Sequence, residues 1–300
     1  MPDQKTTCLS AYLKFGLVSV REVYHHWQAQ GGVELVRQLY WRDFWIQLGK
    51  NRFSIVEVMP KVLLFNCVYL GHYNPHVIGA SLKPNYDAIK WVDDDELFEA
   101  WCEGRTGYPV VDAAMMQMNT TGKTQRFESQ HHYVFIGYMH NRARMFTSNF
   151  LIKILGIDWR KGEKYFATKL IDYDMLVNNG NWQWSSSTGA DSQPYFRIFN
   201  PWNQSSKFDK DAVYIKRYLP NLKGVAPSHL HDWEKGHKHY NLKKLNYVKP
   251  CCDYKKCRDR TLNMYKTALD QATKWAMTHS ICVIAPNSIF STLNITGHVL

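Results

Sequence analysis

Several signatures of common protein classes are missing from this chain of 300 residues. No alternation of strand and helix patterns occurs, and neither does the GxGxxG or GxxxxGKS/T loop that binds phosphate groups in α/β proteins. Cys251, Cys252 and Cys257 lie near His237 and His239, but no CxxC pair or HxxxH spacing accompanies them. Zinc is therefore a weak hypothesis, and we expect no metal site.

Long apolar runs are also missing, so we expect no segment that spans a bilayer. The chain shows no secretory signal peptide, and its seven cysteines are an odd number, which is typical of free thiols in a reducing compartment. We therefore expect a soluble intracellular protein without a membrane partner.

Charged residues make up only 21% of the chain and hydrophobic residues 45%, which indicates a globular protein. Aromatic residues reach 14%, with eleven Trp, and form either a large core or stacking surfaces for flat ligands. The net charge of +11 favours a polyanionic partner, although a basic surface is often only a solvated one. The excess is uneven, because residues 207–260 hold fourteen Lys or Arg against six Asp or Glu.

Helical periodicity dominates the apolar pattern, so we predict an all-α fold. Ser19 and Glu22 match a capping box, and the acidic residues at 93–95 suit the positive end of a helix dipole. The predicted helices span Val20–Gln28, Val33–Gly49, a segment beginning at Asp93–Asp95, Val110–Met118 after Pro109, Asn141–Leu155, Gly162–Ile171 and Arg260–Met277.

The stretch from Tyr138 to Pro201 concentrates Arg, Asn, Asp and Trp more densely than a merely structural segment would. Buried Arg, Asp and Asn each cost free energy unless they find partners. The stretch therefore predicts a polar cavity that accepts a large ligand.

Five motifs together resemble the FAD-binding helical domain of the DNA photolyase/cryptochrome family. They are TTCLSAYLKFG from Thr6, QLYWRDF from Gln38, EGRTGYPVVDAAM from Glu103, YMHNRARM from Tyr138, and the run Asp172–Trp184. They occur in the order of the family, and the resemblance covers about residues 6–233. It is closest to cyclobutane-pyrimidine-dimer photolyases, because Asn141 stands where (6-4) photolyases and animal cryptochromes carry a second His.

The resemblance implies that residues 1–240 form the FAD-binding catalytic domain and leaves 241–300 as a basic and apolar C-terminal extension. Residues 123–137 are an insert, and residues 54–86 are expected to be an irregular surface excursion. Family members carry an α/β antenna domain before this region. Here we expect that domain to be absent or supplied by a separate polypeptide, a possible partner of a monomeric chain.

The cofactor implied by the resemblance is FAD. Arg144 would pair with Asp172 beside the flavin, and Asn178 would face flavin N5, where Asn is the photolyase-like residue. Cys8 departs from the family's Arg, which weakens the expected phosphate affinity. From the residues alone, a structural salt bridge, a helix cap and a turn remain open. The implied cofactor contacts are Thr6, Thr7, Leu9, Ser10, Arg42, Tyr138, Asn141, Arg144, Asp172, Asp174 and Asn178.

Tryptophans and basic residues would complete the implied site. Trp182, Trp159 and Trp91 match the family's electron relay, although three core tryptophans would look the same in sequence. Gln38 stands where dimer photolyases have Glu, which predicts weaker repair but retained binding. The implied contacts to DNA and to a flipped-out lesion are Gln38, Trp41, Asn141, Arg142, Met145, Trp184 and Arg197.

The sequence thus predicts a deoxyribodipyrimidine photolyase, a carbon–carbon lyase driven by light and reduced FAD and acting on damaged DNA in the cytoplasm or nucleus. Two alternatives stay open. One is a cryptochrome-like blue-light photoreceptor. The other is a degenerate DNA-binding relative without repair activity, which has lost flavin through Cys8, the insert and the missing antenna half.

Overall fold

The computed structural model describes residues 6–54, 79–119 and 137–278, and within these ranges the regular structure is entirely helical. The predicted all-α fold is confirmed. The elements are α1 (Ser10–Lys14), α2 (Val20–Ala29), α3 (Val33–Ser54), η1 (Pro84–Tyr86), α6 (Asp95–Cys102), α7 (Pro109–Asn119), α8 (Asn141–Asn149), the π-helix η2 (Phe150–Leu155), α9 (Trp159–Lys169), α10 (Met175–Ser186), α11 (Pro201–Phe208), α12 (Val213–Tyr218), η3 (Pro220–Leu222), α13 (Pro227–Leu230), α14 (Trp233–Gly236), η4 (His237–His239), α15 (Leu242–Leu245) and α16 (Tyr254–Thr278).

Most predicted helices are present, but their ends differ from the prediction. Asp158 caps α9 by accepting a hydrogen bond from the backbone N–H of Arg160, so the helix begins before Gly162. Asp94 caps α6 in the same way through Leu97. The capping box at Ser19 was wrong in detail, because Ser19 occupies the N-cap position of α2 without a side-chain cap hydrogen bond.

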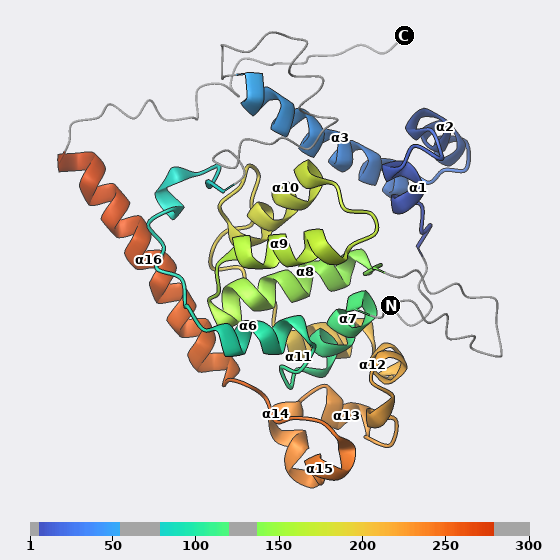
Figure 1. The fold of residues 1–300 in the computed structure, drawn as a ribbon, viewed down its shortest axis with the longest axis vertical. Helices are drawn as coiled ribbons and strands as arrows, with labels where there is room; N and C mark the ends of the chain where they lie inside the picture. The colour runs from blue at the N-terminus through green and yellow to red at the C-terminus, as the bar shows by residue number, and fades with distance from the viewer. Residues whose placement is uncertain (1–5, 55–78, 120–136, 279–300) are drawn as a thin grey trace.

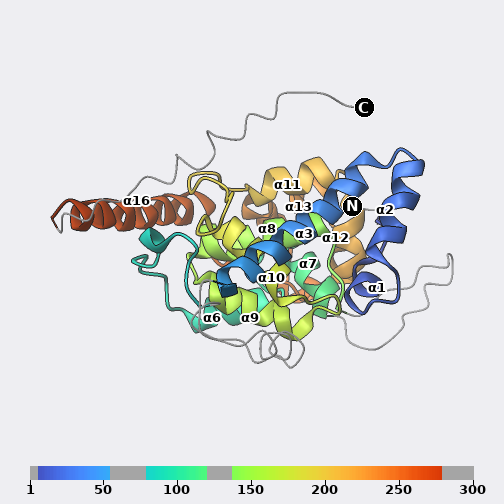
Figure 2. The same cartoon turned by 90° about the horizontal axis from the view of Figure 1, so that it is seen from above.

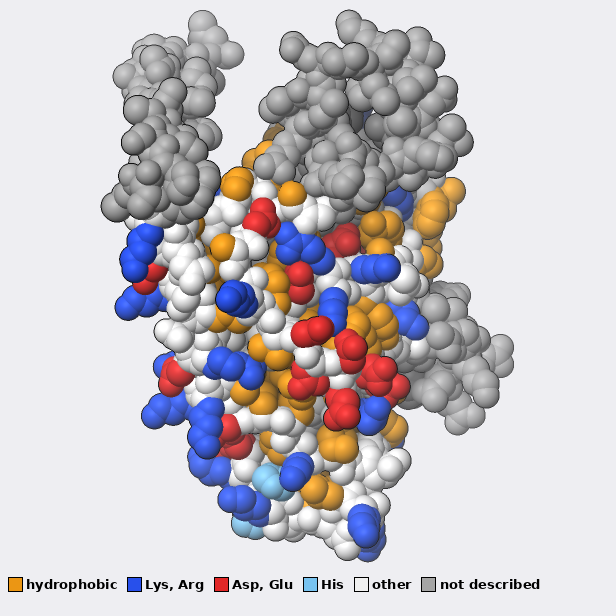
Figure 3. All heavy atoms as spheres, turned by 60° about the vertical axis from the view of Figure 1, so that its left-hand side comes forward, with side chains coloured by type: hydrophobic (Ala, Val, Ile, Leu, Met, Phe, Trp, Pro, Cys, Tyr) orange, Lys and Arg blue, Asp and Glu red, His pale blue; other side chains and the backbone are white. Residues whose placement is uncertain are grey.

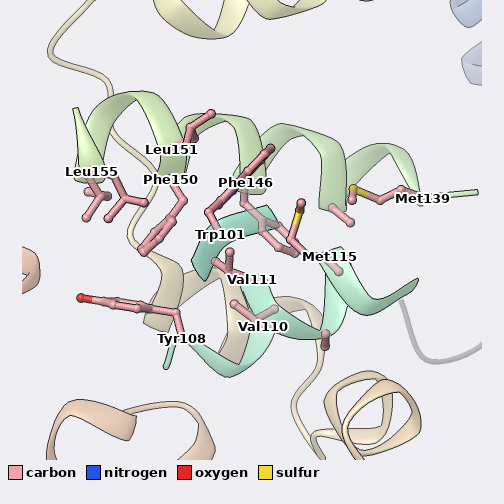
Figure 4. Packing of buried hydrophobic residues seen from close by; sticks show 14 of the residues in the cluster. Trp101, Tyr108, Val110, Val111, Met115, Met139, Phe146, Phe150, Leu151 and Leu155 are labelled. Atoms are coloured by element: carbon pink, nitrogen blue, oxygen red, sulfur yellow. The ribbon is translucent and has the colours of Figure 1, made fainter. Parts of the chain in front are cut away.

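The core forms where α8 and η2 run as one continuous rod against α6 and α7. Figure 4 shows Phe146 and Phe150 pointing from this rod toward Val111 and Met115 of α7, with Trp101 of α6 between the helices. All five side chains are buried. Removing such a side chain from water contributes about 1.5–3 kcal/mol each, so this contact fixes the direction of α8.

The first three helices form a separate layer. Val23, Trp27 and Leu39 bury one another in a small cluster of their own. Figures 1 and 2 show α3 lying across one end of the bundle, over α10. The two helices approach closely because α10 has glycine at the crossing: a Cβ at Gly180 would lie 2.3 Å from the Trp45 ring.

The C-terminal helices close the opposite end of the bundle and one of its sides. The small helices α13, α14 and α15 lie at the end of the long axis away from α3, and α16 runs along the side (Figure 1). Tyr265 and Ala268 of α16 are buried in the core. The division at residue 240 remains a prediction.

Three segments of the sequence analysis fall outside the described residues. They are most of the irregular stretch at 54–86, the insert at 123–137 except for Gly137, and the apolar tail from 281. Within the described ranges, no helix is long and apolar enough to cross a membrane.

Candidate functional site

Arg144 and Asp172 form a partly buried ion pair. The guanidinium Nη2 of Arg144 lies 3.0 and 2.8 Å from the two carboxylate oxygens of Asp172, and its Nε donates to the carbonyl of Met139 at 2.8 Å. The Asp172 side chain is only 4% exposed, whereas that of Arg144 is 27% exposed. The pair therefore presents an arginine edge to the surroundings while its carboxylate stays covered.

The N-terminal segment lies against the start of α8. The Thr6 hydroxyl is hydrogen-bonded to the Tyr138 hydroxyl at 2.9 Å, and the Arg144 guanidinium lies 5.9 Å from the centre of the Tyr138 ring. Burial raises the pKa of the Tyr138 phenol. The backbone N–H of Cys8 donates to Thr6 Oγ1, and Cys8 has a φ of 51°, in the left-handed region.

The next residues of this segment lead into α1. The N–H of Leu9 donates to the Thr7 hydroxyl at 3.4 Å. Leu9 is the N-cap of α1 and provides no side-chain cap, and Ser10 is the exposed first residue of that helix. Thr6 therefore lies beside Tyr138, and Thr7, Leu9 and Ser10 follow it into the start of α1.

Asp174 links α10 to α1. Its carboxylate caps α10 by accepting from the N–H groups of Leu176 and Val177 at 3.1 and 3.2 Å. It also lies 3.4 Å from Nζ of Lys14, the last residue of α1. Lys14 is a site residue that sequence reasoning missed, although it lies within the motif that begins at Thr6.

Asn178 is held by a buried carboxyl group. Its Nδ2 donates to the carbonyl oxygen of Glu163 at 3.1 Å and to Glu163 Oε1 at 3.0 Å. Burial raises the pKa of Glu163, and the hydrogen bond from Asn178 lowers it. These contacts fix which end of the amide faces α9. Asn178 lies within α10, so the alternative of turn chemistry beside Gly180 was wrong.

Two of the three tryptophans of the expected relay lie on the adjoining helices α9 and α10, and Trp91 lies in the segment before α6. Trp182 and Trp159 are buried, and Trp91 is half-buried with its ring 5.8 Å from that of Tyr265. Trp182 contacts Phe166 with ring centres 5.0 Å apart and packs on the backbone of α9 at Gly162, where a Cβ would lie 2.3 Å from its ring. Among the described residues, no direct ring contact joins the three tryptophans.

Trp41 and Trp184 come from the two helices that cross at Gly180. Trp41 is partly exposed on α3, and its ring stacks on Trp45 with centres 6.1 Å apart. Trp184 is half-buried on α10. Gln38 lies on α3 one turn before Trp41, and its amide donates to the carbonyl of Glu34 on the same helix at 3.5 Å. The structure therefore brings the two indole-bearing helices together, with Gln38 on one of them.

Two cationic residues, one on α8 and one on α11, lie over the same aromatic ring. The Arg142 guanidinium lies 4.7 Å from the centre of the Phe208 ring, and Lys207 Nζ lies 5.5 Å from the same ring. Sequence reasoning missed Lys207 and Phe208, whose only signal was the basic composition of that segment. The remaining expected residues are half-buried Arg42 on α3, exposed Asn141 and half-buried Met145 on α8, and exposed Arg197 before α11.

A family model described as the FAD-binding domain of DNA photolyase matches residues 35–127 and 133–267. The deoxyribodipyrimidine photo-lyase of Vibrio cholerae is 39% identical over 273 residues, which cover 88% of this chain and 50% of that protein. Other relatives with the same description are 34–44% identical.

Solved structures give the same result. The archaeal photolyase of Sulfolobus tokodaii, solved with two FAD molecules, matches with a TM-score of 0.67 at 40% identity, over 87% of this chain and 50% of that one. A cryptochrome of Synechocystis matches with a TM-score of 0.64 at 29% identity, over 86% and 48%. This chain thus spans about half the length of the relatives it matches.

Proposed function

This chain belongs to the family of the FAD-binding domain of DNA photolyase, and on that premise we propose that it repairs cyclobutane pyrimidine dimers in DNA by light-driven electron transfer. The electron enters the lesion, the two carbon–carbon bonds of the cyclobutane ring break, and the electron returns. Since no net oxidation or reduction occurs, the reaction class is that of a lyase.

The observation that carries the proposal is a set of polar side chains, each held in a fixed orientation by a partner on another element. Arg144 is fixed by Asp172, Asn178 by Glu163, and Asp174 by α10 and Lys14. These residues come from α1, α8, α9, α10 and the turn between α9 and α10, and most stay partly exposed. Such a set of donors and acceptors can form hydrogen bonds with the edges of a large polar ring system and hold it in place.

The family to which this domain belongs binds FAD, and the residues present fit that cofactor. Bound in the reduced form, it would supply the electron that light transfers to the lesion. Arg144, Asp172, Asp174 and Asn178 would hold the flavin ring. Arg42, which has no ion-pair partner among the residues described, is available to a diphosphate. The hydroxyls and backbone N–H groups of Thr6, Thr7, Leu9 and Ser10 would also bind the diphosphate. Tyr138 and Asn141 would be further cofactor contacts.

We propose that the lesion is held between Trp41 and Trp184. A base stacked on an aromatic side chain gains about 1–3 kcal/mol, which helps offset the cost of flipping it from the duplex. Asn141 and Met145 would contact the lesion from α8, and Arg142 and Arg197 would contact the DNA backbone, which positions the duplex without reading sequence. Gln38 would contact the lesion from α3, one turn before Trp41.

Trp182, Trp159 and Trp91 are proposed to carry electrons inward from the surface. Trp suits this role because its indole is readily oxidised. Trp91 is half-buried, whereas the other two tryptophans are buried, so Trp91 fits the end of the electron-transfer path nearest the surface.

The test is direct. Protein loaded with FAD and reduced is mixed with an oligonucleotide that contains a thymine dimer, and the recovery of thymine absorbance is followed under blue light and in the dark. Recovery in the light alone supports repair. A flavin-loaded protein that binds the oligonucleotide but restores no thymine would support the photoreceptor alternative, and a protein that cannot be loaded would support the degenerate relative.

We also propose that the chain acts as a monomer where DNA is found, in the cytoplasm or nucleus, with a separate antenna-domain polypeptide as a candidate partner. The proposed reaction does not need that partner, because a bound flavin absorbs blue light itself. Sedimentation of the purified chain would test the monomer.

A further inference from the structure

A cationic surface lies far from the proposed lesion site. Between Lys235 and Arg258 the chain has eight Lys or Arg and a single acidic residue, Asp253. Seven of these cations are exposed lysines, which we call the basic platform: Lys235, Lys238, Lys243, Lys244, Lys249, Lys255 and Lys256.

The lysines of the basic platform are almost free of internal partners. Lys235 pairs with Asp232 at 2.7 Å, but the other six form no ion pair with any residue that the structure describes. Lys161 on α9 shows the contrast, since its ammonium lies 2.9 Å from both Asp93 and Asp95. Unneutralised cations hold a diffuse layer of counterions, which a bound polyanion releases.

The backbone under the basic platform is firmly attached to the core. The indole N–H of Trp233 donates to the carbonyl of Val248 at 2.9 Å. Asn221 donates to the carbonyls of Leu245 and Asn246 at 2.9 and 3.0 Å, and the Tyr108 hydroxyl donates to the carbonyl of Cys252 at 2.9 Å. The lysines therefore project from a preorganised frame, which lowers the entropy cost of binding an external partner.

The basic platform and the proposed lesion site lie at different ends of the molecule. Figure 1 shows α14 and α15 at one end of the long axis and α3, which carries Trp41, at the other. In Figure 3 Lys and Arg side chains gather toward the lower end, where these small helices lie, while acidic side chains gather higher on the same face. The platform therefore lies at the end of the molecule away from α3 and Trp41.

We propose that the basic platform binds the phosphate backbone of duplex DNA without regard to lesion or sequence. The choice of DNA rests on the proposed function, which brings this chain to DNA. A membrane fits less well, because the exposed large hydrophobic side chains lie elsewhere, for example Phe15 and Leu17 at 65% and 71% exposure, and none lies between 235 and 258. Lysine ammonium groups suit phosphates as point charges.

The experiment measures affinity for an undamaged duplex of about two helical turns by fluorescence anisotropy over a series of salt concentrations. Each phosphate contact contributes about 0.9 to the slope of log K against log salt concentration. We therefore expect the slope to become shallower by about 2 in Lys243→Gln/Lys244→Gln, and again in Lys255→Gln/Lys256→Gln. Lys90→Gln/Lys164→Gln removes two exposed lysines outside the platform and is the matched control.

Equal slopes in the wild type, both platform variants and the control would overturn the proposal. So would loss of binding to phosphatidylserine vesicles, rather than to duplex, in the platform variants. Thermal unfolding of each variant checks that the fold is intact. The proposed function is tested separately, since platform variants should still repair a short single-stranded dimer oligonucleotide. A chain that fails to repair leaves the duplex measurement valid.

Discussion

At the scale of single residues, we expect the ion pair of Arg144 and Asp172 to be sensitive to substitution. Replacing Arg144 by Met would leave the carboxylate of Asp172 covered without its cation, since that side chain is only 4% exposed. Stranding a buried charge costs roughly 3 kcal/mol or more. We expect Arg144→Met to lower the free energy of unfolding in urea by about that amount.

The double variant Arg144→Met/Asp172→Asn is the control for this prediction. It removes the stranded charge, so it should recover part of the stability lost in the single variant. A single variant as stable as the wild type would show that Asp172 finds water or another partner.

Asn178 offers a second test, because its amide nitrogen lies 3.0 Å from Glu163 Oε1. Asn178→Asp would place two carboxyl groups at this distance in a partly buried position. Like charges this close share a proton, so one of the two pKa values rises strongly. We expect the variant to lose stability as pH rises through the raised pKa, because deprotonation then forces both groups to ionise.

Denaturation of Asn178→Asp at several pH values would measure this loss. Asn178→Asp/Glu163→Gln lacks the second charge and should show little of the added pH dependence. A single variant whose stability follows the wild type across the pH range would contradict the geometry of the pair.

At the scale of elements, α10 shows where sequence reasoning stops. Its sequence, MLVNNGNWQWSS, is rich in Asn, Gly and Ser, which favour turns over helices, so periodicity did not predict it. Tertiary contacts hold it instead. Asp174 caps its N-terminus, and the buried ammonium of Lys153 lies 3.4 Å from the carbonyl of Ser186 and 2.9 Å from the Ser187 hydroxyl at its C-terminus.

Helical periodicity predicted the all-α fold, and the motifs predicted the family and indicated residues that lie on adjoining elements. They could not predict side-chain partners that are distant in sequence. Glu163 on α9 holds Asn178 on α10, and Lys14 at the end of α1 pairs with Asp174 before α10. A motif records which residues are present, whereas rotamers and packing decide which ones meet.

The packing of α9 on α10 leads to a prediction about glycine. A Cβ at Gly162 would lie 2.3 Å from Cη2 of Trp182 and 2.5 Å from a Leu151 methyl carbon. Helix propensity favours Gly162→Ala by about 1 kcal/mol. Overpacking against a buried indole costs about 1–3 kcal/mol, so we expect a net loss of stability, with a shifted Trp fluorescence spectrum.

Urea unfolding monitored by circular dichroism would measure this loss. Gly224→Ala is the control, because no atom lies within 4 Å of the position of its Cβ. It should be neutral within a few tenths of a kcal/mol. A stabilised Gly162→Ala would mean that α9 and α10 separate at no cost.

Asp112 ties α7 to the segment before α16. Its carboxylate accepts from the backbone N–H groups of Thr106 and Gly107 and from the hydroxyls of Thr106 and Tyr247. Burial nevertheless raises its pKa from 3.8 to about 6. The folded state therefore holds the proton more tightly than the unfolded state does. The resulting stabilisation is complete below about pH 4 and is lost as pH rises toward 6.

A shift of this size corresponds to about 3 kcal/mol at most. Asp112→Asn cannot titrate, so its stability should vary less between pH 4 and 6 than that of the wild type, although it is less stable overall because it loses an acceptor. Chemical denaturation of both proteins over this range gives the difference. Parallel curves would indicate that Asp112 keeps an ordinary pKa in the fold.

At the scale of the whole molecule, charge and apolar surface are divided along the long axis. Most of the exposed large apolar and aromatic side chains lie between residues 12 and 44, including Phe15, Leu17 and Trp41, and the basic platform lies at the far end (Figure 1). A lesion seated near Trp41 and Trp184 would have the platform on one side only. One arm of a damaged duplex would then be held more strongly than the other.

This asymmetry predicts how affinity depends on the length of the DNA. Affinity for a dimer-containing duplex should rise as one arm is extended and stay constant as the other is extended, because only one arm reaches the platform. Each added phosphate contact also steepens the salt dependence. In Lys255→Gln/Lys256→Gln the gain from the longer arm should shrink, while the affinity for the short duplex stays unchanged. Equal gains from both arms would mean that the two ends of the molecule bind DNA independently.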